Sequence, residues 1–357
     1  MNLMKPILIP AVLTTTVSAV LLAACSQTQI DSAATEANEQ TTASITSSSD
    51  VSSYTGSASL TQGVAKTDVT NAYECARGRQ TNIGSIQSTD GKLWTVPAAT
   101  NLLNTDFPVA SDLNNPCTGN DYRTASEALA QLDGSDIIEI DADGEVYTAY
   151  VFADNYFEMY VNGVAVGRDN VPFTQFNSNI VRFKAKAPFT VAMHLVDWEE
   201  NLGIGSESNN GSAFHAGDGG LVAVITDKDN SIIAKTDKNW KAQTFYTAPI
   251  RDLSCVSESG GARLSSNCVT TATVQDGSAD YGLHWELPTN WQQADFDDSS
   301  WPNATTYSNQ TIGVDNKSAY TNFIDIFDNE KADAQFIWST NVVLDNEVIV
   351  RYTVNGL

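Results

Sequence analysis

The stretch "VYTAYVFADNYFEMYVNGVAVGRDN", from Val146 to Asn170, indicates the fold class of this 357-residue chain. It contains two runs rich in Val, Tyr and Phe, and Asn162-Gly163 separates the second run from another alternating segment. Aromatic and β-branched residues favour strands, and Asn-Gly between alternating apolar residues is the strongest short-range signal for a hairpin. We therefore expect antiparallel strands here.

The second run also predicts which side chains face the core, because successive residues of a strand point to opposite faces. One face carries Phe157, Met159 and Val161. The other carries Tyr156, Glu158, Tyr160 and Asn162. We expect the apolar set to be buried and the other set to be exposed or half-exposed.

Similar runs continue to the end of the chain. Strands are expected at 137–140, 146–152, 156–162, 180–185, 189–198, 220–226, 231–235, 240–246, 334–344 and 347–354, the last two joined by a tight turn at Asp345-Asn346. Many short strands separated by turn residues are typical of a mainly β sandwich or barrel, predicted here as one domain over 136–357. Residues 71–135 form a smaller N-terminal segment with a short helix expected at 124–132, where Thr124 and Glu127 have capping-box spacing.

Two motifs support a resemblance to a known family. "EMYVNGVAVGRDNVPFTQF" (158–176) resembles the strand-and-hairpin element of galactose-binding-like jelly-roll domains, which bind sugars in β-galactosidases and rhamnosidases. "FDDSSWPNA" (296–304) is similar to a loop of the same domains, although the two motifs occur here in the reverse order. The resemblance implies a jelly-roll β-sandwich that binds carbohydrate. It also implies that Trp301 packs on the core and that Asp297 and Asp298 brace the loop.

The N-terminus predicts export. Residues 1–24 carry one charge, Lys5, followed by an apolar run, and end in Leu22-Ala23-Ala24-Cys25. This pattern is typical of a signal peptide, and its ending resembles the lipobox of bacterial lipoproteins. The resemblance implies that Cys25 is acylated and that the protein is lipid-anchored at the outer membrane or cell surface. The alternative is an ordinary secretory signal with a Cys near its end.

The segment after Cys25 predicts a flexible tether over 25–70, because 19 of the 45 residues from Ser26 to Thr70 are Ser or Thr. The chain is strongly acidic, with a net charge of −24. Removal of 1–24 leaves 18 basic residues against 43 acids, a charge of −25. This charge argues against nucleic acid as a partner and against docking on anionic lipid, so we expect membrane contact through the lipid anchor only.

The four cysteines after Cys25 predict disulfides, as an even number does in an exported chain. Three pairings are open, of which Cys75 with Cys117 and Cys255 with Cys268 is the simplest. A zinc site is disfavoured because no Cys-x-x-Cys spacing occurs.

The segment "DWEENLGIGSESNNGSAFHAGDGG" (197–220) is the candidate site, because so long a connection between two strands is usually functional or disordered. A Trp beside carboxylates suits a sugar, which stacks on the ring and donates hydroxyls. The predicted ligand-binding residues are Trp198, Glu199, Glu200, Glu207, His215 and Asp218. Asp197, Glu200 and Asp218 are candidate ligands for a structural Ca²⁺, which prefers oxygen ligands. The alternative is a solvated acidic loop with Trp198 beneath it.

No catalytic motif stands out. His-Glu-x-x-His, Gly-x-Ser-x-Gly and phosphate-cradling glycine loops are absent from the sequence, and no organic cofactor is indicated. The sequence therefore favours a non-catalytic, surface-tethered protein that binds carbohydrate or another extracellular ligand. Two alternatives stay open: a polysaccharide-acting enzyme that uses Glu199, Glu200 or Glu207 with His215, and a structural component of the envelope or matrix.

Overall fold

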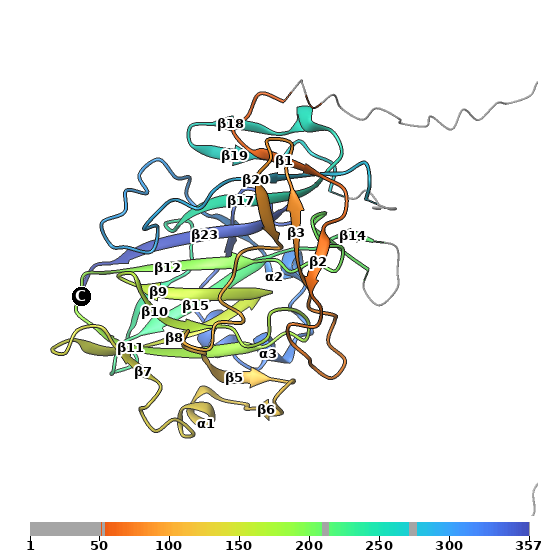
Figure 1. Cartoon of the computed structure of the whole chain (residues 1–357). Helices are drawn as coiled ribbons and strands as arrows, with labels where there is room; N and C mark the ends of the chain where they lie inside the picture. Colours follow the sequence, from red (N-terminus) through yellow and green to blue (C-terminus); the bar gives the residue numbers. More distant parts are fainter. Residues whose placement is uncertain (1–50, 52–53, 209–213, 271–276, 357) are drawn as a thin grey trace, which may run out of the picture. The chain divides into compact units, whose positions relative to one another are not determined.

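The computed structural model describes residues 51, 54–208, 214–270 and 277–356, which lie within one compact unit, Ser47–Leu357 (Figure 1). The predicted signal peptide, the predicted acylation site Cys25 and the predicted tether up to residue 50 lie outside the described residues. None of the helices in the described ranges is long and apolar enough to span a membrane.

Two large sheets make up most of the described chain. The seven-stranded sheet contains, in spatial order, β1 (Ser59–Gln62), β20 (Tyr281–His284), β17 (Lys241–Ile250), β23 (Asp345–Val354), β12 (Phe189–Val196), β9 (Tyr156–Val161) and β10 (Val164–Arg168). The nine-stranded sheet follows the order β21 (Thr305–Tyr307), β22 (Phe336–Trp338), β15 (Gly220–Thr226), β8 (Glu145–Asp154), β11 (Ser178–Ala185), β5 (Ser111–Asn115) and β6 (Asn120–Asp121), with β16 (Ile232–Lys235) beside β15 and β7 (Ile137–Glu139) beside β11. All these pairings are antiparallel except that of β7 with β11.

Smaller elements fill the connections. Three small sheets are formed by β2 (Lys66–Val69), β3 (Ile83–Gln87) and β4 (Leu93–Val96), by β13 (Ser206–Glu207) and β14 (His215–Ala216), and by β18 (Ser257–Ser259) and β19 (Ala262–Leu264). The helices are α1 (Ala125–Leu129), α2 (Asn309–Ile312), α3 (Ser318–Thr321), α4 (Ile324–Phe327) and a 3₁₀ turn, η2 (Leu253–Cys255). Thr124 caps α1 as expected, accepting a hydrogen bond from the Glu127 N–H.

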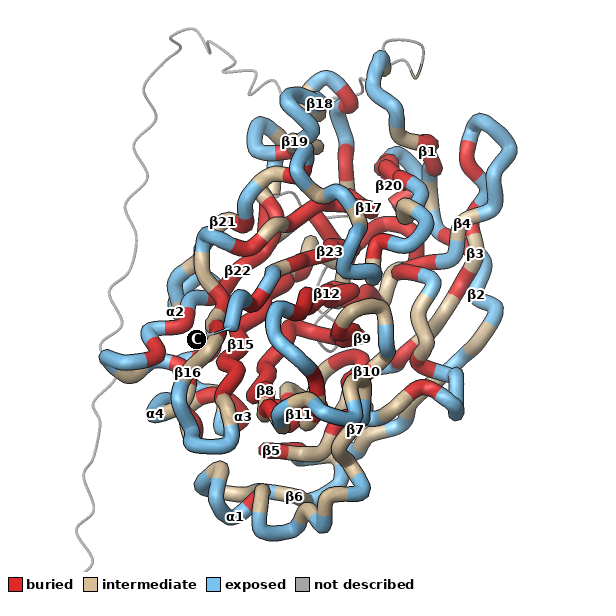
Figure 2. Tube along the Cα trace, turned by 90° about the vertical axis from the view of Figure 1, so that its left-hand side faces the viewer, coloured by how far each residue is buried: buried red, intermediate tan, exposed pale blue. Residues whose placement is uncertain are grey.

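The main core lies between the two large sheets, which confirms the predicted sandwich. Phe157 and Met159 of β9 share this core with Val181 of β11 and Val222 of β15. Figure 2 shows the buried strands of both sheets as continuous red segments. The Asn162-Gly163 hairpin is also confirmed: β9 and β10 pair with Val161 opposite Val164, and both turn residues have positive φ, 49° and 83°.

The prediction of an exposed or half-exposed second face on β9 holds for Asn162, which is half-buried, and was wrong for the other three residues. Tyr156, Glu158 and Tyr160 do alternate with the core residues, but they are 0%, 1% and 9% exposed. A second apolar layer covers this face of the seven-stranded sheet, where the Tyr160 ring meets Phe107 edge-on at 5.5 Å and Trp291 at 5.3 Å. The covering segments lie far from β9 in the sequence, so local periodicity could not reveal them.

The predicted domain limits differ from the structure. Strands β1 and β2 lie inside the range predicted as a tether, and β1 extends the seven-stranded sheet by pairing with β20. Strand β5, from the predicted N-terminal segment, pairs with β11 of the nine-stranded sheet. The chain before residue 136 is therefore part of both large sheets.

The predicted hairpin over 334–354 was also wrong. β22 ends at Trp338 and belongs to the nine-stranded sheet, whereas β23 starts at Asp345 and belongs to the other. The connection crosses between the sheets, and the buried Asp345 carboxylate stabilises it. It accepts hydrogen bonds from four hydroxyl groups, those of Ser339, Thr244, Thr247 and Ser265.

Both disulfides follow the simplest pairing. Cys75–Cys117 closes a separation of 42 residues, and Cys255–Cys268 closes one of 13. In the loop of the second family-like motif, Trp301 is buried, Asp297 accepts a hydrogen bond from the Ser299 N–H, and Asp298 pairs with Arg351 at 2.8 Å. These three residues thus have the packing and bracing roles that the resemblance implies.

Candidate ligand-binding site

Trp198, the predicted sugar-stacking residue, belongs to the core. Its side chain is 1% exposed, its ring packs edge-on against Tyr156 at 5.9 Å, and its Nε1 donates to the Asn82 carbonyl at 3.1 Å. The prediction failed because Trp198 continues the line of β12 onto the covered face of the seven-stranded sheet. No ligand can stack on this ring in the described structure.

Glu199 is also buried, and it braces the loop that follows it. Its carboxylate accepts hydrogen bonds from the N–H groups of Gly203 at 2.9 Å, Ile204 at 3.1 Å and Gly205. Gly205 has a φ of 55°, and a Cβ there would lie 2.5 Å from the Ala248 carbonyl oxygen. Burial raises the pKa of Glu199 to about 7, although the three backbone donors oppose the shift.

The remaining predicted residues separate into two places. Glu200 accepts hydrogen bonds from the N–H and hydroxyl of Ser208, at 2.5 and 2.6 Å. Glu207 pairs with His215 across the short β13–β14 ladder and forms an ion pair with Arg79. The loop therefore reaches Arg79, a residue that the sequence did not single out.

Asp197 and Asp218 do come together, and they are joined by Asp154, which the sequence analysis missed. Burial raises the pKa of Asp154 and of Asp197 well above the usual range, and neighbouring acids raise both further: Asp218 acts on both, Asp197 on Asp154 and Glu199 on Asp197. Burial also raises the pKa of Asp218 to about 6, although His215 and Lys317 oppose the shift. In the β8–β15 pairing, Asp154 lies opposite Gly220, which is two residues after Asp218. Predicting that pairing from the sequence would have placed Asp154 beside the other two aspartates.

The structure does not bring together the three predicted Ca²⁺ ligands, Asp197, Glu200 and Asp218. Within the described ranges, no three His, Cys, Asp or Glu side chains form a group that could hold a metal ion. Glu200 is turned to Ser208 and does not join Asp197 and Asp218. The set Asp197, Glu200 and Asp218 is therefore not assembled.

A pocket of about 620 Å³ opens beside the Arg79–Glu207 pair. It is lined by Asn71, Tyr73, Glu74, Cys75, Ala76, Gly78, Arg79 and Gln80. Glu74 and Gln80 are exposed, whereas Tyr73 and Arg79 are half-buried. The pocket wall is thus rich in hydrogen-bonding groups.

The pocket wall is fixed to the sandwich in several ways. The Cys75–Cys117 disulfide joins it to the turn between β5 and β6. The Arg79 N–H donates to the Thr174 carbonyl at 3.1 Å, and the Arg79 guanidinium lies 5.3 Å from the Phe173 ring centre. The pocket wall is therefore held against the connection between β10 and β11 by these contacts of Arg79.

A buried group of Asp and Asn side chains lies in that connection. Asn177 Nδ2 lies 2.8 Å from Asp169 Oδ1, 3.2 Å from Asn179 Oδ1 and 3.4 Å from Asn170 Oδ1. Burial raises the pKa of the Tyr73 phenol in the pocket, and the Asp169 carboxylate raises it further. The group is therefore close to the pocket, and the sequence signal for it is the density of Asp and Asn in 169–179.

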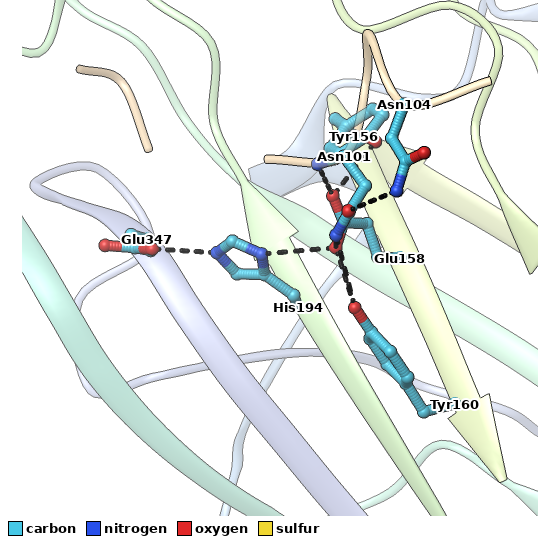
Figure 3. A network of polar contacts seen from close by, with 7 residues as sticks. All are labelled: Asn101, Asn104, Tyr156, Glu158, Tyr160, His194 and Glu347. Carbon is cyan, nitrogen blue, oxygen red and sulfur yellow. Dashed lines mark hydrogen bonds and ion pairs between the residues drawn. The ribbon is translucent and has the colours of Figure 1, made fainter. Parts of the chain in front are cut away.

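Figure 3 shows a second buried polar group, on the covered face of the seven-stranded sheet. The Glu158 carboxylate accepts hydrogen bonds from the Asn101 N–H and side chain and from the hydroxyls of Tyr156 and Tyr160. His194 Nε2 lies 2.8 Å from Glu347, and its Nδ1 lies 3.8 Å from Glu158. The group fastens the segment around Asn101 to the sheet.

The charges of this network stabilise each other. Burial alone would lower the pKa of His194, but Glu158 and Glu347 raise it to about 10. Burial alone would raise the pKa of Glu158, but His194 and Asn101 lower it to about 2. Because both side chains are 2% exposed or less, we interpret the network as structural.

Comparisons with known proteins do not assign this chain to a family. No family model, curated protein or solved structure matches this chain.

Proposed function

We propose that this chain is a lipid-anchored, non-catalytic protein that binds extracellular carbohydrate in the pocket formed by residues 71–80. The observation that carries the proposal is the lining of this pocket, about 620 Å³ in volume. Glu74 can accept hydrogen bonds from sugar hydroxyls, Arg79 can donate them, and Gln80 can do both. A pocket of this size with a few polar groups suits one or two sugar rings.

The location at the outer membrane or cell surface is proposed from the sequence. The Leu22-Ala23-Ala24-Cys25 ending and the Ser/Thr-rich segment behind it support a lipid anchor on a spacer. The net charge of −24 supports a domain that stays clear of anionic lipid and is soluble through self-repulsion. Such a protein would present its pocket to extracellular glycans.

The placement of the acids supports binding over catalysis. A glycosidase needs two carboxyl groups that face the substrate, about 5–10 Å apart. Asp154, Asp197 and Glu199 have raised pKa values, but each is 4% exposed or less. Glu199 also has its oxygens occupied by backbone N–H groups.

A glycan array probed with the detergent-solubilised full-length chain tests the proposal, followed by calorimetry on the strongest hit. Glu74→Gln and Gln80→Ala should each weaken binding about tenfold or more, as expected for lost hydrogen bonds to a ligand. Glu145→Gln is the matched control, because Glu145 is an exposed carboxylate in a different pocket, of about 350 Å³. Loss of binding in the control alone would place the ligand in that other pocket. Absence of any glycan binding would favour a structural role in the envelope.

A further inference from the structure

We infer that the connection between β10 and β11 binds a hard divalent cation of the Ca²⁺ type through Asp169, Asn170, Asn177 and Asn179. This site differs from the set that the sequence predicted. It does not depend on which ligand occupies the neighbouring pocket, so the two proposals can fail separately.

The first argument is an excess of oxygen atoms around one amide. The Asn177 Nδ2 group has two hydrogens, yet it lies within 3.4 Å of three side-chain oxygens, on Asp169, Asn170 and Asn179. Three oxygens from three residues converging on one point resemble part of a Ca²⁺ coordination shell, which contains six to eight oxygens. Asn177 Nδ2 occupies this point, so a cation could bind only if the Asn177 side chain moved aside and turned its Oδ1 toward the cation.

The second argument is that this cluster contains buried polar atoms without partners. Asp169 is 0% exposed; its Oδ1 accepts hydrogen bonds from Asn177 and from the Val171 N–H. Its Oδ2 has no hydrogen-bond partner among the described residues, and the same holds for Asn179 Nδ2 and Ser178 Oγ. A buried polar atom without a partner costs about 1–3 kcal/mol, and more if it is charged. A cation at Asp169 would remove that cost.

The third argument is the local charge. The Asp112 carboxylate lies close to Asp169, because Asn170 Nδ2 donates to Asp112 Oδ1 at 3.1 Å and Asn170 Oδ1 lies 3.4 Å from Asn177 Nδ2, which donates to Asp169. Two carboxylates supply the charge that a divalent cation needs. Arg168 lies beside this group: its Nη1 donates to the main-chain carbonyl of Asp169 at 3.1 Å, whereas Arg168 Nε and Asp169 Oδ2 have no hydrogen-bond partner among the described residues.

Asp112 and Asn170 hold this group in place. Asn170 Nδ2 donates to Asp112 Oδ1 at 3.1 Å, and Asn170 Oδ1 accepts from Asn115 Nδ2 at 3.1 Å and lies 3.4 Å from Asn177 Nδ2. Asn115 Nδ2 also donates to Asp112 Oδ1, at 2.7 Å, and the Asn115 Oδ1 accepts from the Cys117 N–H. The ligands are therefore oriented by a second layer of hydrogen bonds that extends to the Cys75–Cys117 disulfide.

The donor set favours Ca²⁺ over other metals. All four proposed ligands offer oxygen, and neither His nor Cys takes part, which disfavours zinc and copper. Carboxamide oxygens and a bidentate carboxylate suit Ca²⁺, whereas Mg²⁺ demands a tighter octahedron and retains its waters. A search restricted to His, Cys, Asp and Glu would not detect such a site, because three of its four ligands are Asn.

Calorimetric titration of the chelator-treated full-length chain with Ca²⁺, and thermal melts with and without Ca²⁺, test this inference. Ca²⁺ well above its Kd should raise the wild-type Tm by several degrees, because it binds the folded state only. Asp169→Asn should weaken Ca²⁺ binding at least tenfold and remove most of the shift. Asp197→Asn is the matched control, a buried aspartate outside the site, and should retain the shift.

A milder variant and a second probe cover the case in which Asp169→Asn does not fold. Asn170→Ala alters a half-buried ligand and should weaken Ca²⁺ binding several-fold. Tb³⁺ also prefers oxygen ligands, and light absorbed by Tyr73 should excite its luminescence, which Ca²⁺ should quench by displacement. Absence of a Ca²⁺ effect on the wild type, or unchanged binding in both Asp169→Asn and Asn170→Ala, would overturn the inference. So would loss of binding in Asp197→Asn alone.

Discussion

The polar groups around Glu158 and around Asp169 are equally buried but differ in how far the protein satisfies them. Glu158 accepts four hydrogen bonds and lies near an imidazolium, and its pKa falls to about 2. Asp169 accepts hydrogen bonds on one oxygen only, and its pKa rises to about 7. Burial alone therefore does not decide whether a carboxylate is charged: the His194 cation, with the Asn101 donors, lowers the pKa of Glu158, and Asp169 has no such cation paired with its carboxylate. A complete network fastens the fold, whereas an incomplete one indicates a place for a ligand.

The largest effect is expected from breaking the complete network. Glu158→Ala should lower the free energy of unfolding by about 3–5 kcal/mol, because His194 then loses one of its two carboxylates in a buried place. Phe157→Ala, on the opposite face of the same strand, should cost a similar amount. Denaturant unfolding monitored by Trp fluorescence measures both. A loss below about 1 kcal/mol for Glu158→Ala would contradict the interpretation of the network as structural.

The next largest loss of stability is expected from removing the Cys75–Cys117 disulfide, which lies near the polar group around Asp169. Replacement of Cys75 and Cys117 by Ser should cost about 2–4 kcal/mol. The same change at Cys255 and Cys268 should cost about 1 kcal/mol less, because that loop is shorter, with a separation of 13 against 42 residues. Hydrogen exchange should rise at 169–179 in the first variant and stay unchanged at 156–160. Equal exchange in both segments would mean that the disulfide does not support the Asp169 cluster.

The pH dependence of stability should separate satisfied from unsatisfied acids. Glu158 contributes stability above pH 4.5 that is lost as the pH falls toward 2, and His194 contributes stability below pH 6.5 that is lost as the pH rises toward 10. The pKa of Glu199 is raised in the folded state, so Glu199 stabilises the fold only while it is protonated. Its contribution to the free energy of unfolding therefore falls as the pH rises from 4.5 through about 7. Maximum stability is therefore expected near pH 4.5, with a decline above it.

Thermal melts from pH 3 to 9 check this profile. Glu199→Gln should reduce the loss of stability between pH 5 and 8 by on the order of 1–2 kcal/mol, because its raised pKa no longer contributes. A wild-type Tm that rises steadily from pH 5 to 8 would contradict the assignment of raised pKa values to the buried acids.

The smallest effect is expected at Glu200. Within the described ranges its carboxylate accepts hydrogen bonds from the N–H and hydroxyl of Ser208, so Glu200→Ala should cost about 1 kcal/mol. The Ca²⁺-dependent Tm shift should be the same as in the wild type. Loss of that shift in Glu200→Ala would return the metal site to the 197–220 loop.

The sequence predicted the features that depend on neighbouring residues. Alternation in β9 identified the core face, Asn162-Gly163 identified the hairpin, and Thr124 identified the start of α1. It failed where distant segments meet. Trp198 is buried because residues near Asn82 cover it, and Glu158 is buried because the segment around Asn101 does. For the same reason, Asp169 and Asp112 could not be paired by reading either segment alone.

The short strands at the ends of both sheets have a consequence for how densely copies of this protein can be packed. An exposed edge strand offers unpaired N–H and C=O groups to any neighbouring chain, which promotes aggregation. At the ends of the seven-stranded path, β1 has four residues and the β9–β10 ladder is interrupted between Ala165 and Gly167. At the ends of the other path, β21 has three residues and β6 has two. These short or interrupted edge strands offer few unpaired N–H and C=O groups to a strand of a neighbouring copy. Even closely packed copies should therefore remain separate molecules.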